Sequence, residues 1–215
     1  MHLTPREWSA VITAITGISA TIWYIYLIIT KKKIEPVLSS WIVMAGTISL
    51  SFFTYLTSPN KSLVSNMVNL IGIINTTTIL GTLLFTRRGK RIPFTPFQKV
   101  SLGIAGMIAL SWIIIVWGFK GTGIIPNILT QILMIVGYTL TLQKLWGAQR
   151  NTESLFTWWC IFLSSVFAVY TGWVSNDKLA LLYAVRSTVM SFTLVLLMHR
   201  AEYKSRVRVR ARIMG

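Results

Sequence analysis

The segment YIYLIITKKKIEPVLSSWIVMAGTISLSFFTY, residues 24–55, joins two strongly apolar runs through a short cationic loop. Each run belongs to a stretch of roughly 20 apolar residues, which is the length that a helix needs to cross a bilayer core of about 30 Å. The loop between them contains three lysines, at residues 31–33, and Pro36, which are typical of a break between helices. The segment therefore predicts two consecutive membrane-spanning helices.

The composition of the whole chain agrees with this prediction. Hydrophobic residues make up 53% of the 215 residues and charged residues 12%, with a mean hydropathy of +0.64. Soluble domains have about 25% charged residues. Apolar runs of spanning length occur at residues 8–30, 37–57, 63–86, 99–119, 123–143, 154–174 and 179–198. We therefore expect an all-α polytopic membrane protein with seven transmembrane helices.

The distribution of Lys and Arg predicts the orientation of the chain. Sixteen of the 21 basic residues lie after the first, third, fifth and seventh runs, and four lie on the other side. Because cytoplasmic loops are enriched in Lys and Arg, we expect the N-terminus outside and the C-terminus in the cytoplasm of a cell-membrane protein. The remaining basic residue is Arg186, inside the seventh run.

An internal repeat is visible when residues 24–55 are compared with residues 138–170, YTLTLQKLWGAQRNTESLFTWWCIFLSSVFAVY. In each copy a glutamate precedes a tryptophan by six residues: Glu35 and Trp41 in the first, Glu153 and Trp159 in the second. Two three-helix units with a linker helix between them would have the same orientation, and such parallel repeats place solute at their interface. The expected domains are 1–90, the linker 91–121, the second repeat 122–199 and a basic tail 200–215.

This plan resembles the SWEET and PQ-loop superfamily, which has three helices, a linker helix and three helices with the N-terminus outside. Phe167, Tyr170, Gly172 and Asp177 are similar to the family's second-helix pattern, and Phe52 and Tyr55 resemble the same aromatic pair. The resemblance implies a transporter of a small solute. The Pro-Gln dipeptide of the family is absent, and so are the prolines that act as hinges, so no gating residue is carried over.

The candidate solute-binding residues lie on the third and seventh runs. Tyr183 and Arg186 share one helical face, and the asparagines at 66 and 69 share another. In a pseudo-symmetric bundle these faces would form opposing walls of a cavity. The full predicted set is Arg186, Asn66, Asn69, Tyr183, Thr76 and Trp23.

Two interpretations of Arg186 remain open at this stage. An ionised residue at this depth is costly, and no acidic residue lies in the middle of any run. Arg186 either contacts a small polar solute, such as an anion, a sugar or a vitamin-like molecule, or is a structural arginine that bonds to backbone carbonyls. Trp41 and Trp159 are expected to be interfacial anchors.

Other functions are disfavoured by the sequence. We expect no enzyme, because the two histidines lie at opposite ends of the chain and paired mid-span carboxylates, metal-ligand clusters and phosphate-binding loops are missing. No cofactor is expected, and proton coupling is disfavoured for the same lack of mid-span carboxylates. The basic tail is expected to contact anionic lipid headgroups and not nucleic acid. A homo-oligomer is left open, and the competing function is a non-transporting sensor or partner subunit that acts through the tail.

Overall fold

The computed structural model describes residues 3–30, 34–56, 61–87, 94–114 and 124–214, and in these residues the chain is helical without strands. Seven helices lie close to the predicted runs. Their bounds are α1 Pro5–Ile29, α2 Leu38–Leu56, α3 Met67–Thr86, α4 Pro96–Ile113, α5 Ile124–Gly147, α6 Leu155–Val174 and α7 Lys178–Met214.

Local sequence signals explain where several helices begin. The side chain of Thr4 accepts a hydrogen bond from the backbone N–H of Glu7, whose carboxylate accepts one from the Thr4 N–H in return. Thr95 and Gln98 form the same capping box at α4, and a proline follows the capping residue in both helices. These contacts satisfy N–H groups that a helix start would otherwise leave unpaired.

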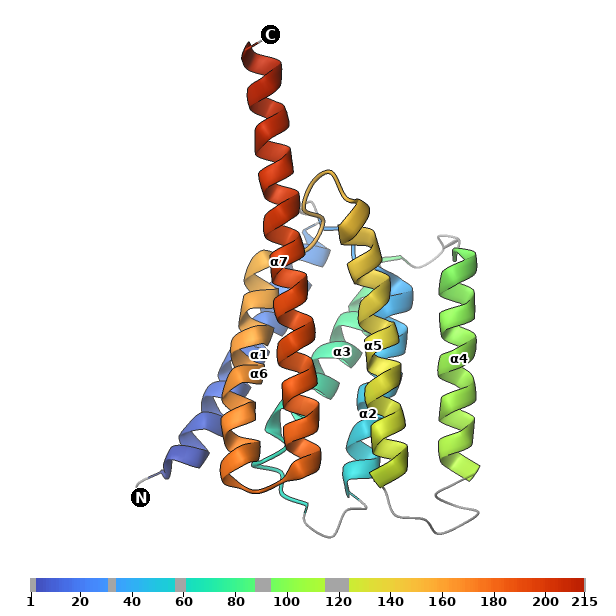
Figure 1. The fold of residues 1–215 in the computed structure, drawn as a ribbon, viewed down its shortest axis with the longest axis vertical. Helices are drawn as coiled ribbons and strands as arrows, with labels where there is room; N and C mark the ends of the chain where they lie inside the picture. Colours follow the sequence, from blue (N-terminus) through green and yellow to red (C-terminus); the bar gives the residue numbers. More distant parts are fainter. Residues whose placement is uncertain (1–2, 31–33, 57–60, 88–93, 115–123, 215) are drawn as a thin grey trace.

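Six of the helices form a closed ring in which each contacts the next, in the order α1, α3, α2, α5, α7, α6 and back to α1. The fourth helix, α4, lies outside this ring against α5 and α2, as Figure 1 shows. Consecutive helices run in alternating directions, so the chain begins at one end of the bundle and finishes at the other. We call these the N-terminal end and the C-terminal end of the bundle.

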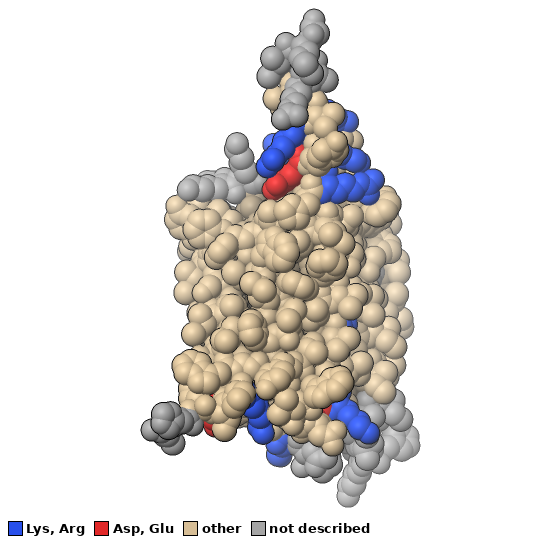
Figure 2. All heavy atoms as spheres, turned by 60° about the vertical axis from the view of Figure 1, so that its left-hand side comes forward, with Lys and Arg blue, Asp and Glu red and all other residues tan. Residues whose placement is uncertain are grey.

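The bundle has the surface of a multi-pass membrane protein. All six ring helices are long and apolar enough to cross a membrane. Figure 2 shows a broad belt that is almost free of charged atoms, with most Lys, Arg, Asp and Glu side chains gathered toward its two ends. For α4 the described helix ends at Ile113, and the rest of its predicted run, with the uncertain boundary at 119–126, falls largely outside the described residues.

The C-terminal tail differs from the separate segment that the sequence suggested. Residues 200–214 continue α7 as one unbroken helix that projects beyond the rest of the bundle (Figure 1). The alternating Val and Arg residues of this segment are thus helical, because α7 provides an existing helix to extend and no strand lies beside it among the described residues.

A tight turn joins α6 to α7 at the N-terminal end. Asn176 has a φ of 50°, a left-handed conformation that asparagine tolerates. A Cβ atom on Gly172 would lie 3.0 Å from the backbone nitrogen of Leu181, so the close approach of the two helices requires glycine there. Asp177 then caps α7, because its carboxylate accepts a hydrogen bond of 3.0 Å from the Ala180 N–H.

Candidate functional site

A central cavity of about 40 Å³ lies inside the ring of six helices. Every ring helix contributes at least one residue to its wall. A volume of this size holds a few water molecules. The lining residues are Gly17, Trp41, Met44, Ile48, Val68, Ile71, Gly72, Asn75, Thr76, Tyr138, Trp158, Ile161, Ser164, Tyr183 and Ser187.

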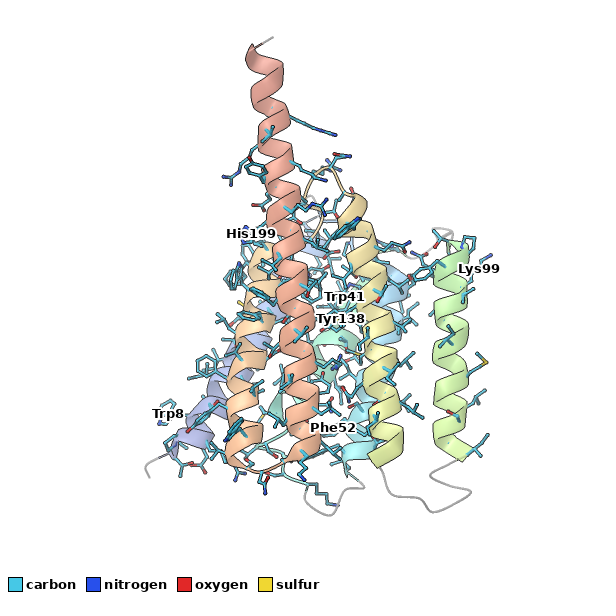
Figure 3. The ribbon with its side chains drawn as sticks, in the orientation of Figure 1. Trp8, Trp41, Phe52, Lys99, Tyr138 and His199 are labelled. Atoms are coloured by element: carbon cyan, nitrogen blue, oxygen red, sulfur yellow. The ribbon has the colours of Figure 1, made fainter. Side chains whose placement is uncertain are left out.

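Four aromatic side chains pack one against the next, and three of them, Trp41, Trp158 and Tyr138, line this cavity. The ring centroids are 5.3 Å apart for Tyr24 and Trp41, 6.5 Å for Trp41 and Trp158, and 5.9 Å for Trp158 and Tyr138. Figure 3 shows Trp41 and Tyr138 in the interior of the bundle. Trp41 is only 2% exposed because its ring packs on aromatic neighbours from two other helices. It is therefore a core residue and not the interfacial anchor that we expected.

Trp41 and Trp158 occupy equivalent places in their helices, since each is the fourth residue of its helix, α2 or α6. The sequence comparison had paired Trp41 with Trp159, which lies one position further along and is partly exposed beside Phe162 and His199. Shifting the alignment by one residue would have identified Trp158 as the interior tryptophan.

The third and seventh helices meet at the cavity. A Cβ atom on Gly72 would lie 2.8 Å from the Tyr183 hydroxyl oxygen, so glycine permits this contact. Asn75 and Thr76 line the cavity next to it, and the side-chain oxygen of Asn75 is buried without a hydrogen-bond partner. Of the predicted site residues, Tyr183 and Thr76 therefore lie at the cavity, and Asn75 joins them.

Arg186 lies beside the cavity but does not line it. Its residue exposure is 7%, and its guanidinium carbon lies 4.6 Å from the centroid of the Tyr183 ring. The Nε–H donates a hydrogen bond of 2.7 Å to the side-chain oxygen of Gln131 on α5. Both Nη atoms are buried and have no hydrogen-bond partner. The cation thus faces α5 with both Nη groups unused, and it forms no ion pair with an acidic residue in the part of the chain that the structure describes.

A buried polar network extends from Arg186 toward α2 and α3. The Gln131 amide donates to the Ser51 hydroxyl at 3.0 Å and to the Asn127 oxygen at 3.2 Å. The Asn69 amide donates to the same Ser51 hydroxyl at 3.4 Å. Asn69 is therefore connected to Arg186 through two intervening side chains and does not form the opposite wall of the cavity.

Two further predicted residues lie away from the cavity. Asn66 immediately precedes α3, is buried, and has no partner for either atom of its side-chain amide. Trp23 is 42% exposed and packs on the outer surface against Tyr26 and Phe156. Neither residue contributes to the cavity wall in this conformation.

A buried, hydrogen-bonded carboxylate lies at each end of the bundle. At the N-terminal end, Asp177 accepts hydrogen bonds of 2.6 Å from both Tyr55 and Ser65. At the C-terminal end, Glu153 accepts one of 2.5 Å from the Tyr24 hydroxyl. Sequence reasoning placed Glu153 in a loop and overlooked it as a site residue. The sequence did contain a signal for this position. Glu153 directly precedes Ser154, a residue type that commonly caps helices and whose side chain caps α6 here, so Glu153 lies at the start of the helix.

Comparisons with known proteins give no relative for this chain. No protein-family model matches it, and neither the curated proteins nor the solved structures that were searched contain a match. The cavity, the aromatic side chains and the buried charges are therefore the features that indicate a function.

Proposed function

We propose that this protein is a membrane transporter that moves a small polar solute by alternating access between two three-helix repeats. The repeats are α1–α3 and α5–α7, with α4 as the linker helix. The observation that carries the proposal is the central cavity, because its wall is built from all six helices of the proposed repeats.

The pattern of helix contacts supports the repeat. Exchanging α1 with α5, α2 with α6 and α3 with α7 converts each contact of the ring into another contact of the ring. The contact of α1 with α3 becomes that of α5 with α7, and the contact of α1 with α6 becomes that of α5 with α2. A pseudo-two-fold axis along the membrane normal is the arrangement that parallel repeats adopt.

The aromatic side chains support the same symmetry. The exchange converts the Tyr24–Trp41 pair of α1 and α2 into the Tyr138–Trp158 pair of α5 and α6. The two tryptophans contact each other across the proposed repeat interface. We infer from these features, and from the resemblance in the sequence, that the protein shares the architecture of the SWEET and PQ-loop superfamily.

Arg186 favours an anionic solute. Its two unpaired Nη groups can form a bidentate contact with a carboxylate or phosphate. Tyr183 connects the guanidinium to the cavity, since Tyr183 lines the cavity and packs against Arg186. A rotation of this ring during opening of the bundle would expose the cation to the solute.

Solute exchange across proteoliposomes tests the proposal. The purified protein is assayed with radiolabelled panels of small carboxylates, sugars and nucleosides. Asn75→Leu removes an unpaired polar group from the cavity wall and is expected to lower exchange about tenfold. Thr78→Val, on the exposed face of the same helix, is the control and is expected to change exchange by less than about twofold.

Two outcomes bear on the role of Arg186 and on transport itself. Arg186→Lys keeps the charge but loses the planar fork, so exchange of carboxylates should fall more than exchange of sugars. If no solute in the panel exchanges faster than through protein-free vesicles, or if Asn75→Leu behaves like its control, the transporter proposal is wrong.

We propose the orientation with the N-terminus outside and the C-terminus in the cytoplasm, in the cell membrane. The basic residues of the loops and of α7 beyond the bundle support it, because Lys and Arg are retained on the cytoplasmic side. The Lys and Arg side chains that lie near the membrane surface are expected to contact anionic lipid headgroups.

A second function is favoured by one observation, the unbroken extension of α7 (Figure 1). A helix that runs from the cavity into the cytoplasm can transmit a displacement to a partner, as a sensor or partner subunit would require. Removal of residues 204–215 distinguishes the two functions. If the protein is a transporter, the truncated form should keep its exchange activity. If it is a sensor, neither form should exchange solute, and the truncated form should no longer act on its partner.

A further inference from the structure

Glu153 is a buried carboxylate that is only half satisfied by hydrogen bonds. It lies in the loop that precedes α6 and is 5% exposed. Its Oε2 accepts the hydrogen bond from the Tyr24 hydroxyl, and its Oε1 is buried without a hydrogen bond of normal geometry, although the Trp158 indole is near enough to lower the pKa of the group. Asp177, at the other end of the bundle, differs because both of its carboxylate oxygens accept hydrogen bonds. An unpaired carboxylate oxygen in the interior favours the protonated form of the group.

A cavity of about 540 Å³ reaches Glu153 from the C-terminal end of the bundle. Its wall includes α7 beyond the bundle and the loop between α5 and α6. The lining residues are Leu27, Ile34, Arg150, Asn151, Glu153, Ser154, Glu202, Ser205 and Arg206. Several of these are charged, so water and protons from the proposed cytoplasmic side can reach the carboxyl group.

Tyr24 connects Glu153 to the central cavity. Its hydroxyl donates to Glu153, and its ring packs against Trp41, which lines the cavity. Tyr24 belongs to α1 and Glu153 leads into α6, so their hydrogen bond joins the two proposed repeats. Separation of the repeats at this end requires the bond to break.

The charges around Glu153 are mixed in sign. Lys144 on α5 and Glu35 in the loop before α2 act on it with opposite effects, and Arg150, Glu202 and Arg206 share its cavity. Burial is the largest influence and raises the pKa of Glu153 to about 7, against the lowering effects of Tyr24 and Lys144. Both protonation states are therefore populated near neutral pH.

We propose that Glu153 is a proton-binding site through which pH on the C-terminal side of the membrane controls solute exchange. The inference rests on the proposed transport function. When Glu153 is ionised, its charge-assisted hydrogen bond with Tyr24 holds α1 against the start of α6. Such bonds are about twice as strong as neutral ones. Protonation weakens the bond, and the repeats can then separate at this end of the cavity.

The experiment measures solute exchange in proteoliposomes while pH is varied on the side of the C-terminus. The solute is whichever member of the carboxylate, sugar and nucleoside panel the wild-type protein exchanges. Wild-type exchange should accelerate as pH falls through about 7, whereas Glu153→Gln should be fast and independent of pH. Tyr24→Phe removes a donor that favours the ionised form, so its transition should move to higher pH.

Glu35→Gln is the matched control, because Glu35 is the counterpart in the first half of the chain and its side chain is 56% exposed in a salt bridge with Arg150. It should keep a pH-dependent profile like that of the wild type, with its transition moved only to somewhat lower pH, because the Glu35 charge raises the pKa of Glu153. If Glu153→Gln also retains that profile, or if its exchange is slow at every pH, the proton-site proposal is wrong while transport stands. If the wild-type protein exchanges no solute at any pH, the transport proposal itself has failed.

A direct readout separates proton binding from transport. Infrared difference spectra recorded during a pH titration of the purified protein should show a protonated carboxyl group that disappears near pH 7. Glu153→Gln should lack this signal, and Glu35→Gln should keep it. Persistence of the signal in Glu153→Gln would assign the proton to another group and overturn the proposal.

Discussion

Replacing Arg186 by methionine should change the stability of the protein little or raise it. The change removes one charged hydrogen bond, from Nε to Gln131, which contributes about 1.5–3 kcal/mol. It also removes two buried Nη groups without partners, each of which costs about 1–3 kcal/mol. The free energy of unfolding should therefore change by between about −1 and +4.5 kcal/mol, where a positive sign means a more stable variant.

Thermal unfolding in detergent measures this change, and the partner residue provides the comparison. For a chain of 215 residues, 1 kcal/mol corresponds to about 2–4 °C in Tm. Gln131→Leu alone leaves the whole guanidinium unpaired and should lower Tm. The double variant Arg186→Met/Gln131→Leu removes both partners of the Arg186 bond, but it also loses the Gln131 bonds to Ser51 and Asn127. Its Tm should therefore lie above that of Gln131→Leu and below that of Arg186→Met. A loss of several kcal/mol in Arg186→Met alone would refute the reasoning, because it would show that the Nη groups stabilise the bundle.

Three further predictions concern the fold, the pH dependence of stability and the topology. Gly172→Ala should lower Tm, since its Cβ would lie 3.0 Å from the Leu181 backbone, whereas Gly46→Ala, which meets nothing within 4 Å, should not. Because the pKa of Glu153 is raised from 4.5 to about 7, the folded protein binds this proton more tightly than the unfolded chain. Its stability should then fall by about 3 kcal/mol as pH rises from about 4.5 to about 7, and Glu153→Gln should lose this dependence in chemical unfolding. A reporter enzyme fused to the C-terminus should be active in the cytoplasm, and one fused to the N-terminus outside; the reverse result would refute the orientation.

The helices could be predicted from the sequence because membrane crossing leaves a strong signal. Apolar runs of sufficient length and the cationic breaks between them gave all seven helices, with ends that differ by several residues. Extension of α7 to Met214 was not predicted, because its charged residues end the apolar run without ending the helix. Apolarity reports contact with lipid, and helix ends are determined by capping and packing as well.

The site was harder to predict because the direction of a side chain depends on how the helices pack. Helical spacing grouped Asn66 with Asn69 and Tyr183 with Arg186, but it did not determine which pair faces the cavity. In the structure Tyr183 meets Gly72, and Arg186 turns instead toward Gln131. A contact between α5 and α7 decides this direction, and no spacing within α7 contains that information.

The charges of the second half of the chain break the symmetry of the proposed repeats. The tyrosine–tryptophan pairs occur in both halves, so each repeat contributes a similar aromatic pair beside the cavity. Glu153 is buried, whereas Glu35 is exposed and paired with Arg150. An axis along the membrane normal keeps equivalent residues of the two halves at the same end of the bundle, so Glu35 and Glu153 both belong to the C-terminal end. Because Glu153 lies at that end alone, its protonation changes the energy of the C-terminal end without changing the other end, as alternating access requires.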